Sequence, residues 1–556
     1  MKKIYLFFFL SSYLTVAIAQ QTVGVFKNDS TSVNGYTLIS NLNSSQTYMI
    51  DNCGEIVNLW SASIYNPGPV LYFLDDGSLF KTCKLTTGNF RAGGSGGRLE
   101  RYDWDDNLIW EYDFDSPTER QHHDAVPMPN GNFLVLAWDL ITLPQAKADG
   151  LDTNLHNQEV WSEKVVEIQP IGTDSAAIIW EWRLWDHIIQ DFNSTANNFG
   201  VVGQNPQLVD LNYINNNGRS RDYFHANGLD YNPTLDQIII SVRNYDEFWI
   251  IDHSTTTAEA ATNAGGNVGM GGDILYRWGN PETYQQGTIN DKKLFGQHHP
   301  NWIPAGDRDA GKIMVFNNGF NAPIQTSKVQ IINPPVLSNG GYTKSANVAF
   351  GPTTVDWSYD LPVFVDFVSG AYRMENGNTF ITSGPDGHLY ELDDRDTVVW
   401  EYVSPLLPNN VRASQGNMPN ANTMFRATKF SADLPIFSSV TLRPQGQLEQ
   451  NPTASNCVIY PNSITGLGSL ESKIDEITIA PNPTNGQFIV RASGVNNSTV
   501  QVQIRDISGR IVHDETIKSA NSSFNKQFDL SENSKGIYFI TIFDGATVTN
   551  DKIILQ

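Results

Sequence analysis

The stretch ENGNTFITSGPDGHLYELDDRDTVVW, at residues 375–400, decides the fold class. It opens on an Asn-Gly turn at Asn376-Gly377, passes through an Asp-rich turn at 393–396 and ends with two valines before Trp400. Asn-Gly turns between strand-like runs are a strong local signal of a β-hairpin. The stretch therefore predicts short strands separated by tight turns, with the tryptophan on the last strand.

The same unit recurs along the chain between residues 35 and 460. Its tryptophan follows a short, mostly apolar run at six places: Trp60, Trp110, Trp180, Trp278, Trp357 and Trp400. Its tight turn leads into a strand-like run at 75–79, 129–133, 232–236, 304–306, 375–379 and 419–423. Six units of roughly 70 residues suit four-stranded blades, and packing such sheets around an axis leaves few exposed edges. We predict an all-β chain with a six-bladed β-propeller at residues 20–460, in which the tryptophans fill the cores between blades.

The composition excludes several classes of function. The 556 residues include 36 Lys and Arg against 59 Asp and Glu, and the resulting charge of −23 would repel a nucleic acid. Three cysteines are too few for a disulfide-rich scaffold, and no Cys-x-x-Cys pair indicates structural zinc. Cys53, Cys83 and Cys457 allow one disulfide in an exported protein, and the sequence leaves the pairing open.

The N-terminus has the features of a secretory signal peptide. Lys2 and Lys3 precede an apolar run at residues 4–18, and Ala17-Ile18-Ala19 supplies the small residues that signal peptidase requires. The run is too short for a membrane anchor, and no second run of spanning length follows. We expect a signal peptide at residues 1–19 and an exported mature protein without a transmembrane segment.

The C-terminal part has a sequence pattern of its own. A linker at residues 461–475 precedes strand-like runs at 487–492, 500–505, 510–512, 526–530 and 538–543, with turns at 508–509 and 535–536. Such regularly spaced turns predict a small immunoglobulin-like β-sandwich at residues 476–556.

This tail resembles the C-terminal sorting domain of type IX secretion cargo. The matching segments are Pro481-Asn482-Pro483, Asp506-Ile507-Ser508-Gly509-Arg510, Gly536-Ile537-Tyr538 and Lys552-Ile553-Ile554-Leu555. The resemblance implies a Bacteroidetes-type bacterium, the type IX secretion machinery as a partner, and a protein that passes the periplasm and outer membrane to be secreted or held at the cell surface. The alternative is an accessory sandwich that binds a ligand, because small β-sandwiches serve many functions.

Three histidines share one position relative to the turns of successive units. His123 and His298 lie six residues before Pro129 and Pro304, where their turns start, and His225 lies six residues before Tyr231, which precedes its turn. Residues at one register of a propeller sit at one height around its axis, and this register comes just before each innermost strand. We therefore expect the three imidazoles to converge on the central funnel, while strand alternation turns His122 and His299 away from it.

Two more residues and one insertion belong to this arrangement. Arg243 follows the His225 segment by one strand and turn, so we expect it to return to the same funnel mouth as a buried, anion-facing group. Ser369 occupies the histidine register in the fifth repeat. The longest departure from the repeat, residues 182–222, is expected to lie over one face and shape access to it.

The middle of the chain resembles the bacterial arylsulfate sulfotransferase family over most of residues 36–435. The matching motifs are His-His-Asp before Pro-Asn-Gly-Asn (122–132), His-Ala-Asn followed by Ser-Val-Arg (225–243) and Gln-His followed by Phe-Asn-Asn-Gly (297–319). Members are six-bladed propellers that need no nucleotide sulfate donor. They pass a sulfuryl group from an aryl sulfate to a phenol through a sulfohistidine, with ping-pong kinetics.

The resemblance assigns roles to residues by position. It assigns catalysis to His298, as the nucleophile, and to His123, His225 and Arg243, with Asn227 and Ser369 binding the substrate. Ser369 stands where the family is expected to have a threonine. The implied partners are a small aryl sulfate donor and a phenolic acceptor, and neither a metal nor another cofactor is expected.

These residue types suit sulfuryl transfer. A sulfuryl group in transfer, like a phosphoryl group, is an electron-poor centre with charge on its oxygens and with nucleophile and leaving group in line. A neutral imidazole can attack it, and cationic or amide donors can hold its oxygens. A further His or Arg can protonate the departing phenolate.

Two other functional classes remain open. Three convergent histidines can bind zinc in a hydrolase or lyase, although Arg243 in the same funnel would repel a metal ion. A non-catalytic propeller can instead bind a glycan or another extracellular ligand. Its binding face would then be the aromatic-rich insertion around Trp182, Trp185 and Tyr223.

Overall fold

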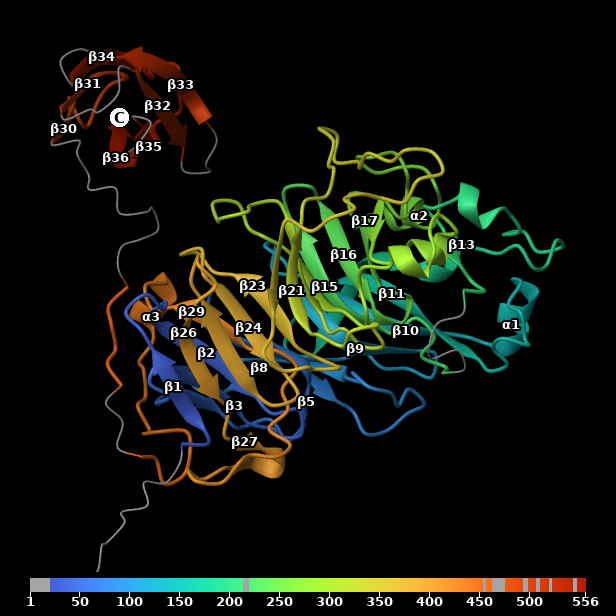
Figure 1. The fold of residues 1–556 in the computed structure, drawn as a ribbon. Helices are drawn as coiled ribbons and strands as arrows, with labels where there is room; N and C mark the ends of the chain where they lie inside the picture. The colour runs from blue at the N-terminus through green and yellow to red at the C-terminus, as the bar shows by residue number, and fades with distance from the viewer. Residues whose placement is uncertain are drawn as a thin grey trace, which may run out of the picture. The chain divides into compact units, whose positions relative to one another are not determined.

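The computed structural model describes residues 21–213, 220–453, 457–462, 476–493, 499–506, 511–519, 523–543 and 548–556. The chain divides into two compact units, Met1–Asn462 and Ser463–Gln556 (Figure 1). The predicted signal peptide and residues 463–475 of the predicted linker lie outside the described residues.

The first unit is a six-bladed β-propeller, which confirms the predicted fold class. From the innermost strand outward, the first two blades contain β29 (Thr428–Ser431), β2 (Gly35–Ser40), β3 (Thr47–Asp51) and β4 (Ile56–Trp60), and then β5 (Pro67–Phe73), β6 (Leu79–Lys84), β7 (Gly97–Tyr102) and β8 (Leu108–Asp113). In the same order, the third and fourth contain β9 (Glu119–Pro127), β10 (Phe133–Ile141), β11 (Val160–Ile171) and β12 (Ser175–Arg183), and then β15 (Ala226–Asn232), β16 (Gln237–Val242), β17 (Glu247–Asp252) and β18 (Tyr276–Trp278). The fifth and sixth contain β19 (His298–Trp302), β20 (Ile313–Asn317), β21 (Lys328–Ile332) and β22 (Trp357–Asp360), and then β23 (Gly370–Arg373), β24 (Thr379–Ser383), β25 (His388–Leu392) and β26 (Val398–Val403). The innermost strands β5, β9, β15 and β19 lie side by side in that order, so they form part of the wall of the axis.

The two ends of the propeller chain close the ring. Strand β29 pairs with β2, and Gly35 lies opposite Ser431. Strand β1 (Gly24–Asn28) adds a fifth strand to the last blade by pairing with β26. The prediction of a sixth tight turn at 419–423 was wrong. In the first blade, the innermost strand β29 comes from the C-terminal end of the propeller sequence and its neighbour β2 from the N-terminal end, so no hairpin connects them.

The six repeated tryptophans all lie on the fourth strand of their own blade, counted from the axis. Five are buried and Trp357 is half-buried. Each indole N–H donates to the next blade, in or beside the connection between its third and fourth strands: Trp60 to Asp103, Trp110 to Ser175, Trp180 to Thr255, Trp278 to Pro352, Trp357 to Asp396 and Trp400 to Asn52. The repeat therefore links each blade to its neighbour around the ring, both by packing and by hydrogen bonding.

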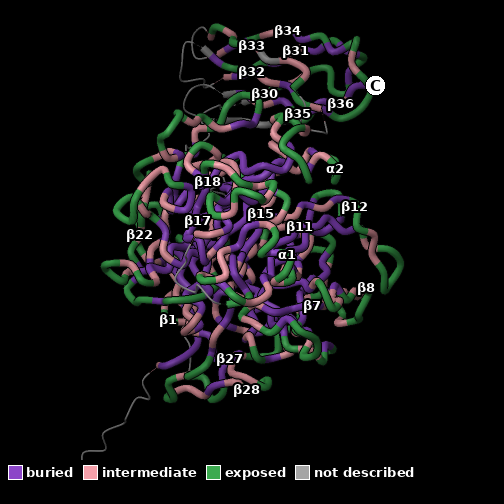
Figure 2. Tube along the Cα trace, turned by 90° about the vertical axis from the view of Figure 1, so that its right-hand side faces the viewer, coloured by how far each residue is buried: buried purple, intermediate pink, exposed green. Residues whose placement is uncertain are grey.

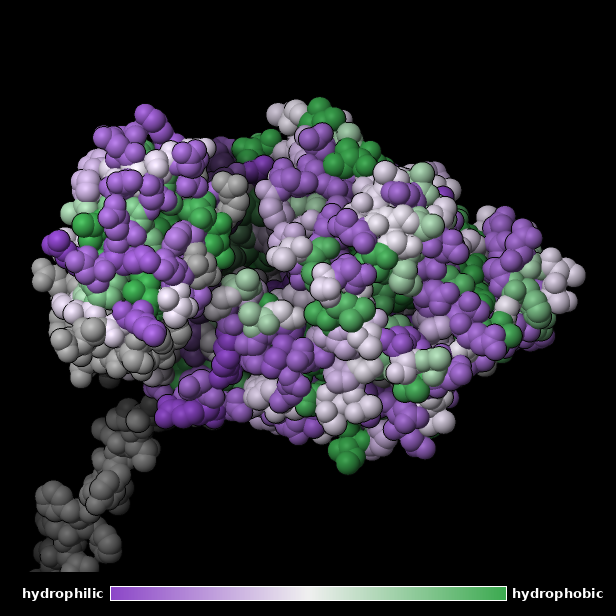
Figure 3. All heavy atoms as spheres, turned by 90° about the horizontal axis from the view of Figure 1, so that it is seen from above, coloured by the Kyte–Doolittle hydropathy of each residue, from purple (hydrophilic) through white to green (hydrophobic). Residues whose placement is uncertain are grey.

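In the propeller, buried residues are concentrated in the interior and exposed residues at the periphery (Figure 2). Hydrophilic and hydrophobic residues are interspersed on the face drawn in Figure 3. Helices are short: α1 (Leu143–Ala148), α2 (Thr257–Ala260), α3 (Pro435–Ser439) and the 3₁₀ turns η1 (Leu184–His187), η2 (Val202–Gln204), η3 (Arg243–Tyr245), η4 (Pro281–Tyr284), η5 (Ile289–Asp291) and η6 (Pro408–Asn410). Two small ribbons add β13 (Ile188–Ile189) with β14 (Val209–Asp210) and β27 (Leu406–Leu407) with β28 (Val411–Arg412). Within the described residues, none of the helices is long and apolar enough to span a membrane.

The second unit consists of two antiparallel sheets. One contains β30 (Glu476–Ala480), β31 (Gln487–Ser493) and β34 (Ser523–Asp529). The other contains β33 (Ile511–Lys518), β32 (Thr499–Asp506), β35 (Gly536–Phe543) and β36 (Val548–Leu555). Phe488, Val502 and Ile540 belong to the single core that the two sheets share. The predicted turn at 508–509 lies outside the described residues.

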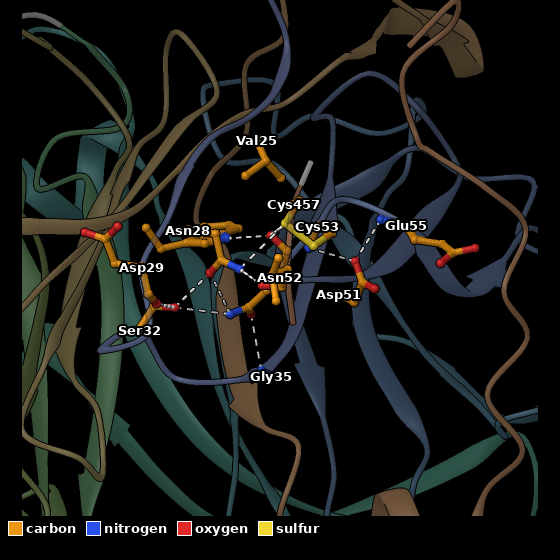
Figure 4. Close-up of a disulfide and its surroundings, with 12 residues drawn as sticks. Val25, Asn28, Asp29, Ser32, Gly35, Asp51, Asn52, Cys53, Glu55 and Cys457 are labelled. Atoms are coloured by element: carbon orange, nitrogen blue, oxygen red, sulfur yellow. Dashed lines mark hydrogen bonds between the residues drawn. A yellow bond between two sulfur atoms is a disulfide. The ribbon is translucent and has the colours of Figure 1, made fainter. Parts of the chain in front are cut away.

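A disulfide settles the cysteine pairing that the sequence left open. Cys53, in the turn between β3 and β4, is bonded to Cys457, while Cys83 is buried and free (Figure 4). Beside it, the side-chain amide of Asn28 donates to the main-chain oxygen of Val458 at 2.8 Å. The segment after the propeller is thus tied back to the first blade.

Replacing Cys53 with serine is expected to lower the free energy of unfolding by about 2–4 kcal/mol. The reason is that the bond closes a loop across 404 residues and so restricts the unfolded chain. Denaturant unfolding of the variant and of wild type, both under oxidising conditions, measures the difference. Wild type with its disulfide reduced is the control, and its free energy of unfolding should match that of the variant. Equal stability of variant and oxidised wild type would contradict this role.

Candidate functional site

The three histidines in one register lie together in the structure. His123 lies in β9, His225 directly precedes β15 and His298 begins β19. The ring centroids of His123 and His225 are 4.7 Å apart, and the Phe425 ring lies 6.2 Å from the rings of both His123 and His298. The propeller axis therefore collects imidazoles from three consecutive blades. Their catalytic roles stay predictions.

The backbone is kinked where the histidines occur. His123, His225 and His299 have φ values of 48°, 52° and 50°, in the left-handed region that non-glycine residues rarely adopt. The strand pairing also shifts register beside each of them. Bulges of this kind re-aim side chains, and strained backbone is concentrated at functional sites. The kinks turn ordinary inner strands into supports for inward-pointing rings.

His298 has a defined tautomer. Its Nδ1 lies 2.7 Å from Oδ1 of Asn318. The Asn318 amide nitrogen donates to the main-chain oxygens of Val365 and Val368, both at 3.1 Å, so the oxygen must face the histidine and accept. His298 therefore carries its proton on Nδ1 and keeps the lone pair of Nε2 free. Burial, reinforced by Arg243, lowers the pKa of His298 to about 3, so the ring is neutral at physiological pH.

His123 is held by a second histidine and a carboxylate. Its Nδ1 lies 2.8 Å from Nδ1 of His122, and Nε2 of His122 lies 2.9 Å from Oε2 of Glu163. The His122 ring stacks on Trp138 with centroids 4.2 Å apart. Oε1 of Glu163 accepts the main-chain N–H of Ala226 at 2.8 Å. His122 thus contacts Trp138 on β10 and Glu163 on β11 of its own blade, and it remains bonded to His123.

His225 is oriented by the end of the long insertion. Its Nδ1 is hydrogen-bonded to Oδ2 of Asp222, and Oδ1 of Asp222 accepts the Trp138 indole N–H at 2.9 Å. Burial by itself raises the pKa of Asp222, but the attraction to His225 outweighs it, so the pKa of this carboxyl lies below its usual value. A carboxylate behind an imidazole fixes its ring and tautomer.

Arg243 supplies the positive charge of the group. It begins η3, its guanidinium lies 4.8 Å from the centre of the Phe320 ring, and Nη2 donates to the main-chain oxygen of Asp366 at 3.4 Å. Within the described chain, no carboxylate lies within ion-pair distance of it. Burial lowers the pKa of Arg243, and burial together with the neighbouring His225 lowers the pKa of His123 far below its ordinary value. The site places two histidines of lowered pKa beside one cation that has no ion-pair partner among the described residues, which suits an anionic ligand.

The two predicted substrate-binding residues are both buried and engaged with the protein. Nδ2 of Asn227 donates to the main-chain oxygen of Gln297 at 2.8 Å, and its Oδ1 has no partner among the described residues. Oγ of Ser369 accepts the N–H of Gly384 at 2.9 Å. Asn227 therefore positions the residue before His298 and keeps one free acceptor, while Ser369 joins two turns. Substrate binding by either residue stays a prediction.

A glycine-rich loop covers His123, and the sequence analysis missed it. The segment AGGSGG at 92–97 lies between β6 and β7, and the main-chain oxygen of Gly94 accepts the N–H of His123 at 2.7 Å. Gly94 has φ +75°, and a Cβ there would lie 2.1 Å from Cε1 and Nε2 of His123. The run of glycines was the available signal, because such close backbone approach excludes any side chain.

Gly94→Ala is expected to reduce aryl sulfate turnover by about 100-fold or more, because the methyl group must displace the His123 ring and a displacement of this size disrupts a positioned site. Gly131→Ala is the matched control, since Gly131 has φ +84° but nothing within 4 Å of an added Cβ. Initial rates with 4-nitrophenyl sulfate, together with melting temperatures, separate the two effects. Equal activity of the two variants would contradict the close packing at Gly94.

Three supporting residues were also missed as parts of the site. Glu163 lies far along the chain from the histidine that it binds, so no local pattern marked it, while Asn318 was noted only within the Phe-Asn-Asn-Gly motif and Asp222 only as the end of the insertion. The insertion was also misjudged in one respect. Trp182 and Tyr223 are buried, so they cannot form the exposed aromatic face on which the glycan-binding alternative rested.

The described residues contain no group of three or more His, Cys, Asp or Glu side chains placed to hold a metal ion. No curated protein sequence matches this chain. Solved structures resemble it only distantly. A protein of unknown function from Bacteroides caccae is 10% identical, with 71% of this chain and 99% of that chain covered and a TM-score of 0.38. A streptogramin B lyase is 9% identical, with 69% of this chain and 86% of that chain covered and a TM-score of 0.33. A periplasmic gluconolactonase of Pseudomonas aeruginosa is 11% identical, with 89% of this chain and 99% of that chain covered and a TM-score of 0.34.

Two family descriptions match the chain. "Secretion system C-terminal sorting domain" matches residues 478–556, which indicates export and either secretion or attachment to the cell surface. "Arylsulfotransferase (ASST)" matches residues 21–402, and this range includes every strand that carries a histidine of the site. The chain therefore belongs to the arylsulfotransferase family and carries a type IX secretion sorting domain at its C-terminus.

Proposed function

We infer that this protein transfers a sulfuryl group from an aryl sulfate to a phenol through a covalent intermediate on His298. In the first half-reaction, Nε2 of His298 forms a bond to sulfur while the bond from sulfur to the phenolic oxygen breaks. In the second, an incoming phenol takes the sulfuryl group and frees His298. The two half-reactions share one site, so the kinetics are ping-pong.

The observation that carries the proposal is the tautomer of His298. Asn318 can only accept from Nδ1, which leaves Nε2 as the free nitrogen. A pKa of about 3 keeps that nitrogen unprotonated throughout the physiological range. A neutral, oriented imidazole is what attack on a sulfuryl group requires.

Arg243 supports the proposal from the electrostatic side. During transfer, negative charge is spread over the sulfuryl oxygens and the departing phenolic oxygen. A guanidinium without a carboxylate partner can stabilise that charge with little reorganisation, since partial burial has already removed part of its water. The same charge disfavours a divalent cation at the three histidines, which argues against the zinc hydrolase alternative.

The phenolic oxygen needs a proton when it leaves and must lose one when it attacks. A phenol has a pKa of about 10, so a phenolate is a poor leaving group without a donor. His123 and His225 lie next to each other and near His298, and each is bonded to a further buried group. We assign this proton exchange to one of these two histidines.

The testing experiment is release of nitrophenolate from 4-nitrophenyl sulfate, with and without a second phenol. Release should accelerate when the phenol is added, and the sulfated phenol should appear in equal amount. Mass spectrometry after donor alone should find one added sulfuryl group on the peptide that contains His298. A rate of nitrophenolate release that does not change when phenol is added would indicate a sulfatase. A folded protein that releases no nitrophenolate would indicate a binding propeller.

A further inference from the structure

Two histidines beside His298 are supported in different ways. His225 is bonded directly to the carboxylate of Asp222. His123 is bonded to His122, and only His122 contacts a carboxylate, that of Glu163. Glu163, His122 and His123 therefore form a chain of hydrogen bonds that runs from β11 to the axis.

The hydrogen bonds of this chain allow two arrangements of protons. An ionised carboxylate can only accept, so Nε2 of His122 carries a proton in both. If His122 is also protonated on Nδ1, it donates to Nδ1 of His123, and His123 then holds its own proton on Nε2. If His122 is neutral, the direction of the bond reverses, so His123 is protonated on Nδ1 and its Nε2 is bare. The charge on His122 thus decides whether His123 offers a proton or a lone pair.

We propose, on the basis of the function proposed above, that Glu163 and His122 store the proton that His123 gives to the leaving phenolic oxygen. As the bond from sulfur to oxygen breaks, the proton on Nε2 of His123 moves to the phenolate, and the Nδ1 proton of His122 moves to Nδ1 of His123. His122 ends neutral, His123 remains neutral and a phenol leaves. An incoming phenol reverses both transfers when it attacks the sulfuryl group on His298.

The surroundings explain why the proton is stored on His122 and not on His123. His123 faces His225, His298 and Arg243 across the axis, and its pKa is far below the ordinary value because it is buried among them. His122 faces Glu163 from β11, and it also lies near the charge of Asp222 from the insertion. A positive charge thus has carboxylate neighbours at His122, but imidazole and guanidinium neighbours at His123.

Glu163→Gln tests the proposal while changing few atoms. Glutamine keeps an oxygen for the Ala226 N–H, but it presents an N–H₂ group to Nε2 of His122. His122 must then accept at Nε2, so its single proton lies on Nδ1 and cannot be passed on. The variant should transfer sulfuryl from phenyl sulfate about 100-fold more slowly or worse, because general acid catalysis has that size. With 4-nitrophenyl sulfate, whose phenol leaves more readily, the loss should be less than about tenfold.

Two variants serve as comparisons. Glu100→Gln changes a buried glutamate in β7, the third strand of the preceding blade, which is bonded to Arg98 and not to the histidines, so it should slow neither donor. Asp222→Asn removes the carboxylate behind His225. If Asp222→Asn and not Glu163→Gln shows the dependence on the leaving group, His225 exchanges the proton and the proposal is overturned. An equal loss of both donors in Glu163→Gln, with a lowered melting temperature, would indicate a merely structural role and also overturn it.

A second measurement does not depend on turnover. In ¹⁵N spectra of histidine-labelled wild type, the Nε2 signal of His123 should change from protonated to bare as pH rises. In Glu163→Gln it should stay protonated at every pH. A His123 signal in wild type that does not move with pH overturns the proton store. Absence of sulfuryl transfer in wild type with these spectral changes intact would instead contradict the proposed function.

Discussion

His298→Ala is expected to abolish the sulfuryl adduct and to reduce transfer between phenols by at least about 10⁴-fold, a loss of the size seen when a covalent nucleophile is removed. Nδ1 of His298 faces a neutral acceptor, the amide oxygen of Asn318, whereas Nδ1 of His225 faces the carboxylate of Asp222 and Nδ1 of His123 faces His122. Adduct formation by mass spectrometry and the rate of nitrophenolate release measure the effect. An adduct that persists in the variant would assign the nucleophile to another histidine.

A matched control for this substitution is His253→Ala. His253 is a largely buried histidine held between Asp236 and Glu167, outside the group at the axis. These carboxylates outweigh burial and raise the pKa of His253 to about 9, so its loss should affect stability and leave transfer unchanged. Loss of transfer in this control would mean that the His298 result reports on folding.

The pH dependence of adduct formation gives an independent check on His298. A histidine with its ordinary pKa of about 6.5 would be mostly protonated at pH 5, and adduct formation would fall by about 30-fold from pH 7. Because the pKa of His298 is lowered to about 3, the neutral nucleophile persists across this interval. With 4-nitrophenyl sulfate, the rate of adduct formation should therefore change by less than about threefold, judged against that 30-fold loss.

Arg243→Gln has the second-largest expected effect, a loss of about 10²–10³-fold in turnover, which is the size found when one preorganised donor to a developing charge is removed. The loss should appear in kcat more than in KM, because the charge to be stabilised grows as the bond to sulfur changes. Arg243→Lys should recover part of the activity, since it keeps the charge without the planar fork.

The control for Arg243 is Arg183→Gln. Arg183 is paired with Asp139 at 2.8 Å and is partly exposed, so it tests the loss of a guanidinium away from the histidines. Steady-state kinetics of the three variants give the comparison. A change in KM alone for Arg243→Gln would show that this arginine binds the donor without stabilising the reaction.

The local charge of the site differs from that of the whole protein. The chain carries a formal charge of −23, yet within the described part of the propeller Arg243 has no carboxylate at ion-pair distance and lies near the rings of His123 and His298. An anionic sulfate can therefore be held only in a small, shielded region. This explains how an acidic exported protein can suit an anionic substrate while remaining unsuited to a nucleic acid.

Much of the fold could be predicted because repetition amplifies weak local signals. One tryptophan after an apolar run says little, but six of them, recurring with tight turns, mark the fourth strands of the blades, and each indole in fact binds the next blade. The closure of the ring could not be predicted in this way. Strand β29 pairs with β2 across nearly the whole propeller sequence, so the turn expected at 419–423 does not occur.

The candidate site likewise contains residues that could be predicted from the sequence and residues that could not. The register of His123, His225 and His298 follows from counting residues, because equal positions in successive blades reach one axis. The groups that set the proton of each ring are contributed by distant parts of the chain: Glu163 from β11, Asp222 from the insertion and Asn318 from the segment after β20. Gly94 is close to His123 only because a loop of the second blade crosses to the third.

The sequence by itself therefore determined the repeat, the blade number, the family and the candidate histidines, since all of these depend on local or periodic patterns. Only the tertiary structure decided the disulfide partner of Cys53, the free nitrogen of His298 and the hydrogen bonds behind His123 and His225. The physical reason is that protonation and tautomer depend on burial and on contacts between residues far apart in the chain, which no local pattern encodes.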